Sequence, residues 1–255
     1  MQLNAMGRRR TCRVQGFSLR FWECGTGEQL LFLHGAGLPA TTFKEIIGIL
    51  SRRYHVIIPE LPGFGSSDFP GRDWSFEEYA TLLHELILCR GYRITRIVGY
   101  SFGGGVALAL ARRVDTLERL VLLSPAGAGV HYRYGGIMVR IAAEAWNGLR
   151  EASRARRRAL FARIAVDFLF NCARHAFLQH RMLHVALHCL RRGYRQGVIG
   201  VPSTIVTVDR DIFFPPALQE RLCRSIPRRR ERQLRGIHLW VLLHPLLAAR
   251  VVFDE

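Results

Sequence analysis

The sequence contains almost no lysine. Lys44 is the only lysine among 37 basic residues, the other 36 are arginine, and the net charge is +17. A nucleic-acid-binding protein gathers positive charge into a patch, and single-strand binders add aromatic side chains that stack on bases. Here arginine is spread along the chain, as a genome-wide codon bias would spread it, and its short clusters lack interleaved aromatics. We therefore expect no nucleic-acid partner and interpret these clusters as solvated surface: 8–10, 156–158 and 228–230.

Long apolar runs are also missing. No stretch reaches the roughly 18 uncharged apolar residues that a membrane-spanning helix needs. The first 16 residues are basic, but no apolar run follows them, so the pattern does not predict a signal peptide. At 49% apolar and 22% charged residues, the composition excludes a disordered chain. We expect a cytoplasmic protein with one sizeable core.

Metal-binding patterns are lacking as well. No two of the six cysteines have C-x-x-C spacing, which favours reduced thiols over a disulfide framework or a zinc site. His180, His184 and His188 would share one face of a helix, but that stretch contains no acidic residue to complete a metal site. We interpret the stripe as a polar helix face and expect neither a metal nor a cofactor.

Short runs that are wholly apolar, or that alternate apolar and polar residues, recur between helical patterns. This arrangement is typical of an α/β fold with a mostly parallel sheet and helices on both faces. Ser75 and Glu78 form a capping box at the start of one helix, and Gly91 ends it. The predicted strands are Phe17–Glu23, Leu30–Leu33, His55–Ile58, Thr95–Val98, Leu117–Leu123, Thr204–Val208 and a short Gln233–Arg235. The other predicted helices are Thr41–Arg52, Phe102–Arg113, Pro216–Arg224 and Pro245–Phe253.

The strand pattern stops for about 75 residues. From 126 to 200 the sequence shows only helical patterns rich in Arg, His, Leu and Phe. We predict that residues 1–125 and 201–255 form the core and that 126–200 form a helical cap over the site. Apolar cap residues are candidates for lining a pocket beneath the cap: Trp146, Phe161, Phe168 and Phe170.

The strongest chemical signal is the motif G-x-S-x-G at 99–103, which ends one predicted strand and opens one helix. A turn this tight brings backbone so close that a side chain at the flanking positions would clash, so glycine is needed there. The turn lifts the Ser101 hydroxyl above the sheet, and the helix behind it offers N–H groups to an oxyanion. We predict that Ser101 is a nucleophile.

A serine hydroxyl needs a base, and the base needs an orienting carboxylate. Asp209 and Asp211 both follow the resumed strand, at the carboxyl end where ligands bind in open α/β sheets. His238 follows the last short strand, and His244 is a rival base at a helix start. At this stage Asp211 and His238 are the preferred acid and base, with Asp209 competing as the acid.

Taken together, these segments resemble the α/β-hydrolase superfamily, in the branch with a helical cap. Leu33-His34-Gly35-Ala36-Gly37 is similar to the family's oxyanion loop, which implies backbone N–H donors from Ala36 and Phe102. The segment 60–68 is similar to the family's structural D-x-P-G-x-G-x-S motif, with Glu60 in place of Asp. The resemblance implies no cofactor.

The resemblance also favours Asp211 over Asp209, because the family's acid stands four residues before a proline, here Pro215. It supports His238, seven residues before Pro245. The chain departs from the family pattern at Val208 and Ile237, where glycine is common. Neither departure removes a reacting group, so the predicted triad is Ser101, His238 and Asp211.

Serine at the elbow argues against haloalkane dehalogenases and epoxide hydrolases, which carry aspartate there. The resemblance therefore implies hydrolysis of an ester or related acyl bond in a small-molecule substrate, through an acyl-enzyme. Alternatives are C–C bond hydrolysis, acyl transfer, or ligand binding without turnover. The arginine-rich segment Arg150–Arg163 adds a weaker alternative, an anionic partner such as a membrane surface or an acidic acyl carrier protein.

Overall fold

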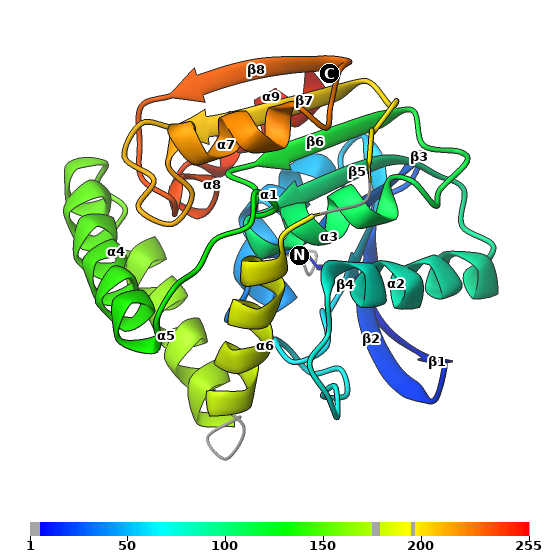
Figure 1. Cartoon of the computed structure of the whole chain (residues 1–255), viewed down its shortest axis with the longest axis horizontal. Coiled ribbons are helices and arrows are strands. Elements are labelled where there is room, and N and C mark those ends of the chain that lie inside the picture. Colours follow the sequence, from blue (N-terminus) through cyan, green and yellow to red (C-terminus); the bar gives the residue numbers. More distant parts are fainter. Residues whose placement is uncertain (1–5, 175–178, 195–196, 255) are drawn as a thin grey trace.

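The computed structural model describes residues 6–174, 179–194 and 197–254, and its centre is one sheet of eight strands (Figure 1). The strand order is β1-β2-β4-β3-β5-β6-β7-β8. β2 pairs antiparallel with β1 and β4, and every other neighbouring pair is parallel. The strands are β1 (Arg8–Val14), β2 (Phe17–Cys24), β3 (Glu28–Leu33), β4 (Tyr54–Pro59), β5 (Ile94–Tyr100), β6 (Arg119–Leu123), β7 (Ser203–Val208) and β8 (Arg229–Leu234). The α/β class with a mostly parallel sheet is confirmed.

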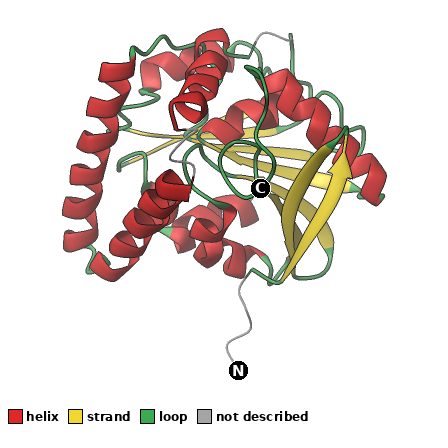
Figure 2. Cartoon of the chain, turned by 90° about the horizontal axis from the view of Figure 1, so that it is seen from below, coloured by secondary structure: helices red, strands yellow, loops and turns green. Residues whose placement is uncertain are grey.

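Helices cover both faces of this sheet (Figure 2). α1 (Lys44–Leu50), after the short 3-10 helix η1 (Ala40–Phe43), covers one face together with α8 (Trp240–Leu243) and α9 (Pro245–Phe253). α2 (Phe76–Arg90), α3 (Phe102–Leu110) and α7 (Pro216–Cys223) cover the other face. Within β3, Leu31 and Leu33 contact one helical layer while Leu30 and Phe32 contact the other, because side chains alternate along a strand. A wholly apolar strand is therefore buried on both faces, as predicted.

The described residues between β6 and β7 form three helices: α4 (Tyr134–Arg154), α5 (Arg158–Arg174) and α6 (Gln179–Arg192). No strand occurs in the described residues between 126 and 200. α4 and α5 lie beyond the end of the sheet to which the strand arrowheads of β6 and β8 point (Figure 1). α6 instead joins the core beside α2, where the Cys189 thiol donates a hydrogen bond to the Trp74 carbonyl at 2.8 Å. We call the segment 134–192 the helical insert.

The two edge strands differ most from the sequence prediction. β1 falls within the first 15 residues, where no strand was expected, and β8 starts four residues before the predicted Gln233. Both strands are rich in arginine and mostly exposed. An edge strand with solvent on its faces has no apolar alternation to reveal it, and charged edge residues discourage pairing with other chains.

The predicted signals for α2 are confirmed. Ser75 and Glu78 form the capping box, and Gly91 ends the helix in the left-handed region with φ of 63°. None of the described helices is both long and apolar enough to cross a membrane.

Candidate active site

Ser101 occupies a sharp turn between β5 and α3. Its φ of 54° and ψ of −121° are unfavourable for a residue with a side chain, so neighbouring contacts must hold it there. A Cβ atom on Gly99 would lie 2.7 Å from the Gly103 carbonyl oxygen, and one on Gly103 would lie 2.2 Å from the Leu33 carbonyl oxygen. Glycine is thus needed at both flanking positions, and the predicted strand–turn–helix setting of the motif is confirmed.

Three side chains from distant segments form one hydrogen-bonded line. His238 Nε2 lies 2.9 Å from Ser101 Oγ, and His238 Nδ1 lies 2.7 Å from Asp211 Oδ2. Asp211 and His238 are 4% and 6% exposed. Nδ1 donates to the carboxylate, so Nε2 is free to accept the serine proton. This geometry matches a nucleophile, a base and an orienting acid.

The structure separates the two aspartates. Asp211 Oδ1 accepts backbone hydrogen bonds from Phe213 at 2.9 Å and Phe214 at 2.8 Å, which leaves Oδ2 for His238. Asp209 Oδ1 accepts a hydrogen bond from the Gly236 backbone N–H at 2.8 Å. Asp209 is therefore bound to the Gly236 backbone, whereas Asp211 faces His238.

The rival base lies elsewhere. His244 Nε2 is 3.6 Å from Glu151 Oε1 on α4, and His244 forms the boundary between α8 and α9. Its imidazole therefore contacts the helical insert, while His238 contacts Ser101.

Asp211 and His238 shift each other's pKa values. Burial lowers the pKa of His238, but the charge of Asp211 and the hydrogen bond to it outweigh burial, so the net shift is upward. Burial raises the pKa of Asp211, but the charge of His238 and the hydrogen bonds to His238, Phe214 and Phe213 outweigh it, so the net shift is downward. The pair therefore favours an ionised carboxylate beside a basic imidazole.

The predicted oxyanion loop passes beside the serine. A Cβ atom on Gly35 would lie 3.3 Å from Ser101 Cβ, so the backbone before Ala36 approaches the nucleophile closely. Phe102 is the first residue of α3, where backbone N–H groups have no partner within the helix. Both predicted donor positions therefore belong to segments that border Ser101.

His34 fixes this loop. Its Nε2 accepts the Leu61 backbone N–H at 3.0 Å, so the proton is on Nδ1, which donates to the Gly35 carbonyl at 2.8 Å. Burial lowers the pKa of His34, which keeps the ring neutral. Glu60 also acts structurally, because its carboxylate accepts hydrogen bonds from Trp22 Nε1 and the Ala40 backbone N–H.

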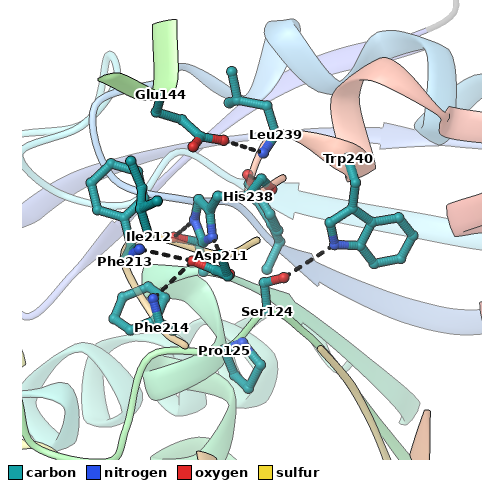
Figure 3. Close-up of polar contacts among 12 residues, drawn as sticks. Ser124, Pro125, Glu144, Asp211, Ile212, Phe213, Phe214, His238, Leu239 and Trp240 are labelled. Carbon is teal, nitrogen blue, oxygen red and sulfur yellow. Dashed lines mark hydrogen bonds and ion pairs between the residues drawn. The ribbon is translucent and has the colours of Figure 1, made fainter. Parts of the chain in front are cut away.

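The helical insert, together with Tyr132 just before it, contacts the loops that carry Gly37, Asp211 and His238. The Tyr132 hydroxyl, just before α4, donates to the Phe213 carbonyl, and the Arg140 guanidinium donates to the Ile212 carbonyl. On α5, Asn171 Nδ2 donates to the Gly37 carbonyl at 3.1 Å. On α4, Glu144 Oε1 accepts the Leu239 backbone N–H at 2.9 Å (Figure 3).

Sequence reasoning missed Glu144, although a signal was present. Ile137, Glu144 and Gly148 are buried on α4, and their spacing of seven and four residues places them on one helix face. A lone carboxylate in a buried stripe points to a specific partner, because burying an unpaired charge is costly.

The aromatic candidates in the insert differ in their surroundings. Trp146 and Phe170 are 61% and 62% exposed, so neither is enclosed as a pocket wall would be. Phe161 and Phe168 are partly buried against the core, and the Phe168 ring would lie 3.2 Å from a Cβ on Gly37. Phe168 is therefore the aromatic of this group that borders the oxyanion loop.

The histidine stripe meets a residue from outside the insert. His184 Nδ1 lies 2.9 Å from Asp73 Oδ1, and His188 Nδ1 lies 3.8 Å from Asp73 Oδ2. The side chain of His180 falls outside the described residues. Within the described part of the chain, no group of three or more His, Cys, Asp or Glu side chains is arranged so that it could hold a metal ion.

A cavity of about 490 Å³ lies at the opposite end of the sheet, lined by residues that include Arg119, Ser203 and Arg229. These three residues begin β6, β7 and β8, whereas Ser101 follows the carboxyl end of β5. Because parallel strands share their direction, this cavity is remote from the triad, and we do not assign it to the reaction.

A comparison with protein-family models identifies the family of this chain. A family model described as the alpha/beta hydrolase family matches residues 30–251. The chain belongs to this family. Its curated relatives include an uncharacterized protein of Mycobacterium tuberculosis, 37% identical over 115 residues, which are 45% of this chain and 34% of that protein.

Two other curated relatives of this alpha/beta hydrolase carry functional names. Lipase 3 of Moraxella sp. is 39% identical over 105 residues, covering 40% of this chain and 33% of the lipase. The 2-hydroxymuconate semialdehyde hydrolase of Pseudomonas sp. is 33% identical over 118 residues, covering 44% and 41%. The alignments thus span less than half the length of these relatives.

Solved structures agree over nearly the whole chain. A serine hydrolase involved in carbazole degradation has a TM-score of 0.75 at 20% identity, covering 97% of both chains. Est816, described as an N-acyl homoserine lactone degrading enzyme, has a TM-score of 0.77 at 19% identity, covering 96% of this chain and 99% of its own. At these identities the likeness shows the shared fold.

Proposed function

We propose that this alpha/beta hydrolase is a serine hydrolase that cleaves an ester or related acyl bond of a small molecule through an acyl-enzyme. One observation carries the proposal: Asp211, His238 and Ser101 form a continuous hydrogen-bonded line with separations of 2.7 Å and 2.9 Å. The strained backbone of Ser101 adds support, because strain of this kind is kept where it presents a reacting group.

In the proposed reaction, His238 Nε2 takes the hydroxyl proton as Ser101 Oγ attacks the acyl carbonyl carbon. The negative oxygen of the tetrahedral intermediate accepts hydrogen bonds from the backbone N–H groups of Ala36 and Phe102. His238 then gives the proton to the leaving alcohol, and the acyl group stays on Ser101. Water attacks next, with His238 again accepting and returning a proton, which releases the acid. Asp211 orients the imidazole and stabilises its charged form.

We also propose that the helical insert covers this site and shapes the acyl pocket. Its contacts with the loops at Gly37, Ile212 and Leu239 support a covering role. Phe168, beside Gly37, is the residue we propose as an apolar wall. The rings of Phe213 and Phe214, with centroids 5.0 Å and 5.5 Å from that of His238, add apolar surface around the base.

The test combines a covalent probe with a substrate panel. A fluorophosphonate probe should label the wild-type protein, and Ser101→Ala should abolish labelling and lower turnover of p-nitrophenyl esters at least about a thousandfold. Esters of increasing chain length identify the preferred acyl group. Product analysis with and without an added alcohol separates hydrolysis from acyl transfer. Labelling that persists in Ser101→Ala refutes the assignment.

A further inference from the structure

Glu144 is a buried carboxylate that the proposed reaction does not use. Its side chain comes from α4 and is 3% exposed. Oε1 accepts the Leu239 backbone N–H at 2.9 Å, while Oε2 is buried without a hydrogen-bond partner. Such a group destabilises a protein unless a positive charge is near, because a buried carboxylate loses its hydration.

The charge that opposes the effect of burial on Glu144 is that of His238. Figure 3 shows Glu144 on one side of the His238–Leu239 backbone, with Asp211 near the His238 ring. On the same peptide, the His238 carbonyl accepts a hydrogen bond from the Tyr100 hydroxyl at 3.0 Å. The Tyr100 ring also stacks on the imidazole, with centroids 5.3 Å apart. The base is thus fixed through its ring by Asp211 and through its backbone by Tyr100 and Glu144.

We propose that Glu144 is a positioning residue for the catalytic base, which holds the backbone after His238 and adds a second negative charge that stabilises the imidazolium. The inference rests on the proposed function, since it assigns Glu144 to the base of that same triad. α4, which carries Glu144, thereby contributes to the electrostatics of the site that it covers.

The electrostatic surroundings are consistent with this role. Burial raises the pKa of Glu144, and the charge of His238 opposes that shift without cancelling it, so the net shift is upward. The charge of Glu144 in turn raises the pKa of His238, in addition to the effect of Asp211. Burial raises the pKa values of Tyr100 and Tyr132, so both phenols stay neutral where histidine titrates.

The Arg140 guanidinium, bound to the Ile212 carbonyl, is a positive group on the same helix as Glu144. Among the described groups around the base, Asp211 and Glu144 therefore supply the negative charge that acts on His238.

Two substitutions separate charge from position. Glu144→Gln keeps an oxygen for the Leu239 N–H and removes the charge, whereas Glu144→Ala removes both. The readout is the rate of fluorophosphonate labelling of Ser101 between pH 5 and 9, which needs no knowledge of the substrate. In Glu144→Gln the half-maximal pH should fall by about one unit. In Glu144→Ala the maximal rate should fall ~10- to 100-fold, and the glutamine variant should retain most of it.

Glu151→Gln is the matched control. It removes a carboxylate two turns further along α4, one that lies 3.4 Å from Arg210 and 3.6 Å from His244 rather than beside the His238 peptide. Its half-maximal pH should equal that of the wild type. Thermal unfolding of each variant separates a catalytic effect from a loss of folded protein.

The outcomes are distinct. An unchanged half-maximal pH in Glu144→Gln overturns the inference, and so does a Glu144→Ala variant that labels as fast as Glu144→Gln at high pH. If the wild-type protein is not labelled at Ser101, the proposed function itself fails. If it is labelled and only the Glu144 effects are missing, the triad stands without this residue.

Discussion

The side-chain amide of Asn171, on α5, donates a hydrogen bond to the Gly37 carbonyl at 3.1 Å, across 134 positions of the sequence. Asn171 is 3% exposed, so the donor side of this contact is buried. Gly37 has a φ of 77° and directly follows Ala36 in the loop between β3 and η1. The position of a proposed oxyanion donor thus depends on a helix of the insert as well as on the sheet.

The first prediction follows from this contact. Asn171→Ala should lower kcat for a p-nitrophenyl ester about tenfold with little change in KM, because a displaced donor weakens transition-state binding more than ground-state binding. Asn147→Ala, which removes the same amide from α4, is the control and should keep wild-type kinetics. Equal kinetics for both variants would show that the contact with Gly37 does not support the oxyanion loop.

The second prediction separates the two aspartates. Asp211→Asn should lower kcat at least about a thousandfold, since His238 loses its orienting acceptor and its preferred tautomer. Asp209→Asn should keep most of the activity, because its amide oxygen can still accept the Gly236 N–H. Steady-state kinetics of both variants measure the two losses. A larger loss of kcat in Asp209→Asn than in Asp211→Asn would assign the acid to Asp209.

The third prediction concerns the pH dependence of activity. In the proposed reaction Ser101 needs a neutral His238 as its base, and the pKa of His238 is raised from 6.5 in the folded protein. The labelling rate with a fluorophosphonate should therefore rise with pH and reach half its maximum above pH 6.5. In Asp211→Asn the remaining activity should reach half-maximum at a lower pH, because the charge that raises the pKa is gone. A wild-type midpoint below 6.5 would contradict the prediction.

The same shifts predict the sign of the pH dependence of stability. His238, with its raised pKa, contributes stability fully below its unfolded value of 6.5, and this contribution is lost as pH rises through the folded value. Asp211, with its lowered pKa, contributes above its unfolded value of 3.8, and this is lost as pH falls through the folded value. Denaturant unfolding should show the largest difference between wild type and Asp211→Asn between these two unfolded values.

The last prediction concerns the nucleophile turn. Gly103→Ala should lower the free energy of unfolding by ~2–4 kcal/mol, because a Cβ there would lie 2.2 Å from the Leu33 carbonyl oxygen, which the sheet holds in place. Gly136→Ala, at a position on α4 with no atom within 4 Å of the new Cβ, should raise it by about 0.5–1 kcal/mol. Urea unfolding of the two variants measures both effects. Equal stabilities would show that the turn can relax.

Several features were predictable from the sequence because they are local. The tight turn at Ser101 needs glycine at positions within the motif itself. The apolar run Leu30–Leu33 indicates a strand buried on both faces. The capping box at Ser75 and the left-handed Gly91 depend only on neighbouring residues. The spacing of Asp211 to Pro215 was informative because the intervening turn itself supplies two backbone N–H groups to the carboxylate.

Other features depend on which distant segments meet, and no local pattern encodes that. β1 and β8 were missed or shortened because an exposed, arginine-rich edge strand has no buried face to impose alternation. Asp73 meets His184 across 111 positions, and neither residue alone indicates the other.

The sequence by itself determined the fold class, the nucleophile turn and the candidates for acid and base, because short-range sterics and the alternation of buried side chains specify them. Only the tertiary structure decided that Glu144 lies against the backbone of His238 and that Asn171 reaches the Gly37 carbonyl. The physical reason is that burial and charge around a group are set by every element packed against it. In this site those elements include α4 and α5, which are inserted far from the triad in the sequence and meet it only when the chain folds.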